Sequence, residues 1–227
     1  MVSAKPMNED EQVIYQISRE YLKKKALSSL EEILDFVAHR LKSNQNFNRN
    51  SILRVIKSLI KRNLIMPGSK LAREDILTVP QRVEILDYIT AMPGTNMKEI
   101  MEFNEIGSSH AVWHLTYLEK FQFVRSVKFG NQKAYFKADF QEKYDEIFFY
   151  LRNTKVKKII KLLKEKKSVT PTKISDQLNI HYNTIKKYLH TLKKFNLLKE
   201  IDEGYKKEYL INQDMFETVQ NVIDNLK

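Results

Sequence analysis

The chain has 227 residues, of which 42% are hydrophobic and 30% are charged, so it can bury cores while its surface stays in water. It contains no cysteine, which excludes disulfides, thiolate nucleophiles and cysteine-type zinc sites. No apolar run approaches the roughly 18 residues that span a bilayer, and the first residues lack the apolar stretch of a signal peptide. We therefore expect a cytoplasmic protein without membrane insertion.

The positive charge is distributed unevenly along the chain. The 39 Lys and Arg residues outnumber the 28 Asp and Glu residues, and the net charge of +11 attracts polyanions such as nucleic acid. Residues 1–80 carry +5, residues 81–149 carry −2 and residues 150–227 carry +8. We therefore expect the two ends of the chain and its middle to have different roles.

The first segment is predicted to be helical. Apolar periodicity predicts helices within 10–25, 28–44 and 48–65, and the spacing of Ser28 and Glu31 is typical of a capping box. The run LIMPGSKLAREDIL that follows is too short and too interrupted by Pro and Gly for a full hairpin. We expect it to be a reduced wing or a linker.

The middle segment shows three helices followed by a hairpin. Helices are predicted within 80–92, 96–106 and 107–124, with a PGT turn between the first two. The β-prone runs FVRSVKF and QKAYFKAD are joined by Gly-Asn, which predicts a hairpin. A hairpin after three helices is typical of a winged helix-turn-helix. A further helix within 139–153 leads to the last segment.

The last segment repeats this order of elements. Helices are predicted within 154–167, 170–180 and 181–198, with Thr170 as a cap and Pro171 at the first helical position. The runs LLKEID and YKKEYLIN around Glu-Gly predict a second hairpin. The terminal helix, within 213–227, has an apolar face that should either pack back or dimerise. That face consists of Met215, Phe216, Val219, Val222, Ile223 and Leu226.

An apolar skeleton recurs in the third helix of each segment, which indicates internal repeats. The aligned sets are Ile52, Ile56, Leu59 and Ile65; Ala111, Leu115, Leu118 and Val124; and Ile185, Leu189, Leu192 and Leu198. We predict a mainly α fold with small β wings, in the α+β class, built from three tandem winged helix-turn-helix domains. The predicted parts are an N-terminal helical domain with a reduced wing at 1–78, a middle winged helix at 79–138, a linker helix at 139–152, a C-terminal winged helix at 153–212 and an amphipathic helix at 213–227.

The middle segment resembles the winged helix-turn-helix transcriptional regulators common in archaea, broadly those of the ArsR and MarR types. The resemblance lies in a Pro-Gly turn before the second helix and an xHLxxLE segment in the third. The matching residues are Pro93, Gly94, His114, Leu115, Leu118 and Glu119. The glycine that the family carries before the final apolar residue is replaced by Gln122 here and by Asn196 in the last segment. The resemblance implies sequence-specific DNA binding through the third helix and the wing, usually by a dimer.

The face of each third helix opposite its apolar stripe is the one that could enter a DNA groove. In the last segment this face and the wing are polar and basic, and we predict DNA contacts from Tyr182, Asn183, Thr184, Lys186, Lys187, His190, Lys194, Tyr205, Lys206 and Lys207. In the first segment we predict phosphate contacts from Arg49, Asn50, Arg54, Lys57 and Lys61. An ordinary solvated helix face is the alternative, and the excess of positive charge favours contact with DNA.

The equivalent face of the middle segment carries few cations. It holds Ser109, His110 and the only tryptophan of the chain, Trp113. Three interpretations stay open: Trp113 is partly buried by a rotation of the helix, it contacts protein, or it enters a DNA groove together with Ser109 and His110.

Catalysis has little support in this sequence. His110 and His114 have the spacing of two metal ligands, but Ala111 stands where a zinc-protease helix requires glutamate, and no third ligand is near. Each of the five glycines fits a predicted turn, so no phosphate-binding loop can be assembled. No GxSxG motif occurs. We expect no enzyme activity, no metal and no cofactor.

Two functions of different classes remain. The first is a transcriptional regulator that binds double-stranded DNA through its basic segments, is associated with the nucleoid and forms a homodimer or binds another protein. The second is a scaffold whose winged helices bind proteins, similar to ESCRT-II subunits or subunits of the transcription machinery. The acidic middle favours the scaffold role for that part, and the basic ends favour DNA.

Overall fold

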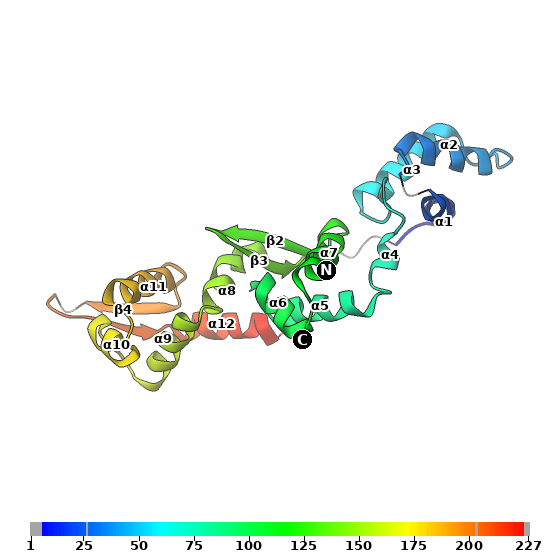
Figure 1. Cartoon of the computed structure of the whole chain (residues 1–227). Helices are drawn as coiled ribbons and strands as arrows, with labels where there is room; N and C mark the ends of the chain where they lie inside the picture. The colour runs from blue at the N-terminus through cyan, green and yellow to red at the C-terminus, as the bar shows by residue number, and fades with distance from the viewer. Residues whose placement is uncertain (1–5, 26, 203, 225–227) are drawn as a thin grey trace. The chain divides into compact units, whose positions relative to one another are not determined.

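The computed structural model describes residues 6–25, 27–202 and 204–224, with side chains described as far as residue 221 (Figure 1). Most of these residues are helical, and the strands among them form small antiparallel sheets. This confirms the predicted mainly α fold with small β elements. The chain divides into two compact units. The first comprises the described residues of Met1–Tyr88, Lys98–Ser126 and Lys137–Asp139, and the second those of Ile89–Met97, Val127–Phe136 and Phe140–Lys227.

The first unit begins with three helices that pack against one another (Figure 1). They are α1 (Glu9–Lys24), α2 (Leu30–Arg40) and α3 (Arg49–Lys61), and each begins at a capping side chain, Asn8, Ser29 and Asn48 respectively. The predicted capping pair of α2 is wrong by one residue. Ser29 and Glu32 form the capping box, because the Ser28 hydroxyl instead donates to the Lys25 carbonyl at 2.6 Å.

The apolar stripes of these helices meet in one core, which includes Ile14, Ile33, Val37 and Ile56. Residues 62–79 follow this core and contain the short helix α4 (Arg73–Ile76) but no strand. Residues 62–79 therefore form no hairpin.

The middle segment contains the predicted helices and hairpin. Its elements are α5 (Pro80–Ala91), β1 (Thr95–Asn96), α6 (Met97–Asn104), α7 (Ser108–Lys120), β2 (Val124–Phe129) and β3 (Gln132–Lys137). The strands form an antiparallel sheet in the order β1-β3-β2, in which Thr95 lies opposite Tyr135 and Asn96 opposite Ala134.

Gly94 is required by the backbone at the turn before β1. Its φ is +79°, and its amide donates to the Tyr135 carbonyl at 2.9 Å. A Cβ atom at this position would lie 3.1 Å from the Phe149 amide nitrogen, which is part of the backbone and cannot rotate away. Glycine is therefore favoured both by the positive φ and by the close approach of another segment.

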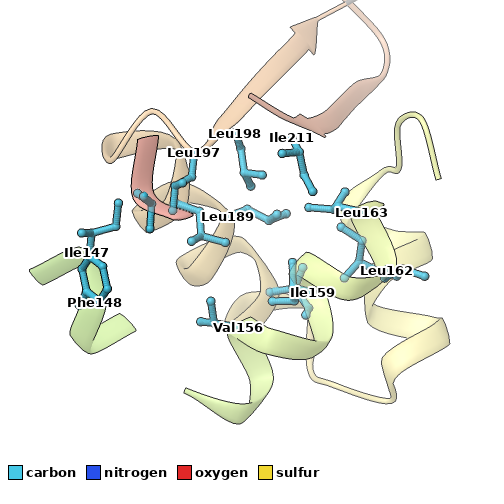
Figure 2. Packing of buried hydrophobic residues seen from close by; sticks show 14 of the residues in the cluster. Ile147, Phe148, Val156, Ile159, Leu162, Leu163, Leu189, Leu197, Leu198 and Ile211 are labelled. Carbon is cyan, nitrogen blue, oxygen red and sulfur yellow. The ribbon is translucent and has the colours of Figure 1, made fainter. Parts of the chain in front are cut away.

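The second unit contains the C-terminal elements around its own core. They are the 3-10 helix η1 (Glu142–Tyr144), α8 (Asp145–Leu151), α9 (Thr154–Glu165), α10 (Pro171–Leu178), α11 (Tyr182–Lys194), β4 (Leu198–Asp202), β5 (Lys207–Ile211) and α12 (Gln213–Asp224). Strands β4 and β5 pair as an antiparallel hairpin. Thr170 caps α10 and Pro171 is its first residue, as predicted. Figure 2 shows side chains of α8, α9, α11 and β5 pointing toward one another, among them Ile159, Leu189 and Ile211.

The third helices of the three segments end with the same backbone geometry. Asn63, Gln122 and Asn196 have positive φ values of 54°, 55° and 60°. The next residue in each segment, Leu64, Phe123 and Leu197, donates its amide to the carbonyl of Leu59, Leu118 and Leu192 at 2.9, 2.9 and 3.0 Å. This is the hydrogen bond of a Schellman motif, for which glycine is the usual residue. All twelve aligned apolar residues of the predicted skeleton are buried.

The described part of α12 packs back on the second unit. Val219 is buried in the core, and Met215 and Phe216 pack against it. The side chains of Val222, Ile223 and Leu226, which we also predicted on this apolar face, lie outside the described residues. No described helix has both the length and the apolarity that are needed to cross a membrane.

Candidate nucleic-acid interface

A left-handed residue forms the turn between α10 and α11. Asn179 has φ 49° and ψ 50°, and the Ile180 amide donates to the Ser175 carbonyl at 3.1 Å. Asparagine adopts this conformation more readily than most residues. His181 then caps α11, because its Nδ1 accepts a hydrogen bond from the Asn183 amide at 3.3 Å. The turn fixes the direction in which α11 leaves α10.

The middle segment has the same turn, and the first segment does not. Glu105 has φ 52°, and the Ile106 amide donates to the Met101 carbonyl at 3.1 Å before Gly107 begins α7. Between α2 and α3, residues 42–48 are all described, and none has a positive φ. The first segment therefore lacks the helix-turn-helix turn.

The outward face of α11 carries cations that no described carboxylate neutralises. Asn183, Lys186, Lys187 and His190 are exposed, whereas Thr184 is half-buried. Among the described residues, neither Lys186 nor Lys187 forms an ion pair. The Lys186 ammonium lies 5.7 Å from the ring centroid of Tyr182, which is also exposed. This face can offer positive charge to phosphates and an amide to a base edge.

Lys194, at the end of α11, is in a different position. Its ammonium lies 3.2 Å from the Glu146 carboxylate of α8. To contact a phosphate it would have to exchange this partner, and an exposed ion pair of this kind is worth about 0–1 kcal/mol.

The hairpin after α11 also carries paired charges. Tyr205 at its tip is 89% exposed. Lys207 lies 3.3 Å from Glu200 and 3.0 Å from Asp202, and Lys206 forms an ion pair with Glu208. The predicted contact residues of the wing are therefore exposed, but both of its lysines already have acidic neighbours.

Glu200 links the wing to α11. Its carboxylate accepts hydrogen bonds from Lys193 of α11 at 2.7 Å and from Lys207 of β5 at 3.3 Å. The hydrogen bond from Lys193, followed by that from Lys207, holds the pKa of Glu200 below its usual range. Lys193 and Glu200 were missing from the predicted site. Their i, i+7 spacing across a helix end gives no sequence signal, because it becomes a contact only when β4 folds back along the helix.

In the first segment Arg49 differs from the other predicted contact residues because it has acidic partners. Asn50, Arg54, Lys57 and Lys61 are exposed along α3, and none of them forms an ion pair with a described residue. The Arg49 guanidinium instead pairs with Glu31 and Asp35 of α2. Carboxylates at this end of α3 make that part of the face less suited to phosphate than the part formed by Arg54, Lys57 and Lys61.

In the middle segment Trp113 rests on a buried cation. The guanidinium of Arg82, from α5, lies 4.7 Å from the ring centroids of both Trp113 and Tyr117 and donates to the Ile76 carbonyl at 3.2 Å. Arg82 is 1% exposed and Trp113 is 49% exposed. Arg82 therefore covers one part of the Trp113 ring, but the residue is exposed, and its contact with protein or DNA stays a prediction. Ser109 and His110 are exposed beside it.

His114 is buried on the inner side of α7, whereas His110 is exposed. Burial, followed by the nearby charge of Arg82, lowers the pKa of His114, so the imidazole is neutral near pH 7. Arg82 was not predicted as part of this cluster, because its distance of 31 positions from Trp113 has no periodic relation to α7. Within the described residues, no three His, Asp or Glu side chains are grouped as metal ligands would be.

Comparison with known proteins supports the helix-turn-helix geometry of the last segment. Residues 155–205, which run from α9 to the tip of the hairpin, match the family model described as "HTH domain". The chain is also 29% identical, over 212 residues, to an "Uncharacterized HTH-type transcriptional regulator" of Methanocaldococcus jannaschii. The alignment covers 91% of this chain and 54% of that protein, so the chain spans about half the length of this curated relative. Turn geometry and family match agree that residues 155–205 contain a helix-turn-helix.

Proposed function

We propose that the chain is a DNA-binding transcriptional regulator that contacts double-stranded DNA through α11 and the β4–β5 wing. The observation that carries this proposal is the outward face of α11, where Lys186 and Lys187 are exposed and form no ion pair with a described residue, next to Asn183 and His190. This face belongs to the segment that matches the helix-turn-helix family. The printed name of the archaeal relative, a transcriptional regulator, agrees with this role.

The residues of the proposed interface have unequal roles. Tyr182, Lys186 and Lys187 are suited to phosphates, and Asn183, with Thr184 and His190, to base edges. The wing residues Tyr205, Lys206 and Lys207, together with Lys194, would join the interface by exchanging carboxylate partners for phosphates. Glu200 would hold the wing against α11 while this happens.

The remaining parts of the proposal concern the rest of the chain. We assign a second phosphate contact to Arg54, Lys57 and Lys61 of α3, with Asn50 beside them, and a minor one to Arg49 because of its acidic partners. We further propose that the middle and last segments are tandem winged helix-turn-helix domains, and that the first segment is a three-helix domain without a wing, where the sequence predicted a third winged domain. A likeness of the middle domain to the ArsR and MarR types and a nucleoid location complete the proposal. The homodimer and the role of Ser109, His110 and Trp113 stay predictions.

Salt dependence of binding tests the proposal directly. Each phosphate neutralised by a cation contributes a slope of about −0.9 to log K against log salt concentration. Fluorescence anisotropy with a labelled duplex of arbitrary sequence is sufficient, because this term does not depend on sequence. Replacing both Lys186 and Lys187 by alanine should make the slope shallower by roughly 1.8 and weaken binding at every salt concentration.

A matched control is available on α9. Lys155 and Lys158 are exposed, and their double alanine variant removes the same charge from another face of the same segment. It should leave the slope nearly unchanged. Binding without salt dependence would contradict the proposal. Equal changes of slope in the two double variants would show that α11 is not the interface.

A further inference from the structure

A groove with an apolar floor lies between α9 and α12 in the second unit. Its volume is about 380 Å³, at the lower end of the roughly 300–1,000 Å³ typical of ligand pockets. The floor is formed by Leu151, Ile160, Phe216 and Val219. Phe216 and Val219 are also the residues by which α12 packs on the core, so the groove follows the line along which this helix is attached.

One side of the groove carries three lysines. Lys157, Lys161 and Lys164 line it and follow one another at i, i+4 and i+7, so they form one stripe on α9. All three are exposed, and none of them forms an ion pair with a described residue. Among the described residues, the lining contains neither Asp nor Glu. Lys164 lies 4.2 Å from the ring centroid of Phe216, so the cationic edge directly adjoins the apolar floor.

This combination selects an anionic amphiphile. A neutral apolar molecule would use the floor and leave the lysines without a partner, whereas a nucleic acid backbone would use the lysines and leave the floor empty. A carboxylate with a hydrocarbon chain satisfies both, because its head accepts charge-assisted hydrogen bonds from the ammonium groups and its chain removes the floor from water.

We propose that this groove is a binding site for a fatty carboxylate, with its hydrocarbon chain between Ile160 and Phe216 and its head at Lys157 and Lys161. The site is distinct from the outward face of α11 and does not depend on DNA binding. Because the ligand would contact both α9 and the residues that attach α12, its binding should also raise the thermal stability of the second unit.

Isothermal titration calorimetry of the full chain with laurate, kept below its critical micelle concentration, tests the site. The variant Lys157→Glu with Lys161→Glu should weaken binding by at least about tenfold, because two attractive charges become repulsive. The control is Lys155→Glu with Lys158→Glu, which makes the same change of net charge, from +11 to +7 (11 − 4), at two exposed residues of α9 that do not line the groove. The control should bind laurate nearly as the unaltered chain does.

Two further measurements distinguish other occupants. Dodecyl maltoside, which has the same hydrocarbon chain and an uncharged head, should bind far more weakly than laurate if the lysines recognise the carboxylate. No binding of laurate, or equal weakening in the two double variants, would overturn the proposal. If instead laurate does not bind and Lys157→Glu with Lys161→Glu converts a dimer to a monomer in light scattering, the groove holds a second copy of the chain and the proposal is wrong.

Discussion

Replacing Gln122 by glycine should stabilise the protein. Gln122 ends α7 with φ 55°, and its side chain is exposed, so the substitution removes little packing. The Phe123 amide that follows donates to the Leu118 carbonyl at 2.9 Å, and this bond requires the left-handed conformation. Glycine adopts that conformation without the contact between Cβ and the carbonyl oxygen that disfavours it for glutamine.

The expected gain is a difference of two terms. The left-handed conformation costs a non-glycine residue roughly 1–2 kcal/mol, and glycine loses about 0.5–1 kcal/mol more conformational entropy on folding. The net gain in the free energy of unfolding is therefore about 0.5–1 kcal/mol. At the equivalent positions Asn63 and Asn196 the gain should be near zero, because asparagine tolerates this conformation better than glutamine.

The fluorescence of Trp113 can be used to measure the effect of this substitution close to the substituted residue. It is the only tryptophan and lies on α7, the helix that Gln122 ends, so its emission during urea unfolding reports on this helix. With a slope of about 1–3 kcal/mol per molar urea, the unfolding midpoint should rise by roughly 0.2–1 M. The control Gln122→Ala keeps the Cβ atom and should not raise it. A lower midpoint for Gln122→Gly, or an equal rise for Gln122→Ala, would refute the reasoning from backbone conformation.

Two further changes test the backbone and the pH dependence of stability. Gly94→Ala should lower the free energy of unfolding by about 1–3 kcal/mol more than Gly68→Ala, as measured in thermal melts followed by circular dichroism. Both glycines have positive φ, but only at Gly94 would a Cβ atom meet another backbone segment. Equal losses in the two variants would show that this close contact is unimportant. Burial raises the pKa of Tyr15 to about 12 from its ordinary value of 10.0, so the unfolded chain loses this proton first and stability should fall as the pH rises from 10 to 12. Tyr15→Phe should make that fall shallower in urea titrations across this range, and an unchanged fall would show that other groups cause it.

Much of the fold could be predicted because it rests on local regularities. The apolar skeleton follows the helical period through α3, α7 and α11, and all of its members are buried. Its last members, Ile65, Val124 and Leu198, lie after the helices in which they were predicted. The hairpins follow from β-prone runs around Gly-Asn and Glu-Gly, and α10 begins where Thr170 and Pro171 predicted. The error at Ser28 is also local, because two adjacent serines each have a glutamate three residues later, and only packing decides which one becomes the cap.

The sequence predicted which residues of the candidate site are exposed, but not which of its cations form ion pairs. Tyr182, Lys186 and Lys187 are exposed as expected, since exposure follows from the position of the apolar stripe. The position of the apolar stripe does not show which cations are neutralised, because their acidic partners come from other helices and strands. Lys194 pairs with Glu146, which lies 48 positions away, and Arg49 pairs with two residues of α2.

The sequence by itself determined the helices, the hairpins, the buried stripes and the excess of positive charge at the two ends, because each depends on the spacing of residues within one element or on composition alone. Only the tertiary structure decided which cations remain unpaired, that Trp113 rests on buried Arg82, and that α12 adjoins the lysines of α9 to form a groove. These properties depend on side chains of distant segments meeting in space, and such meetings leave no period in the sequence.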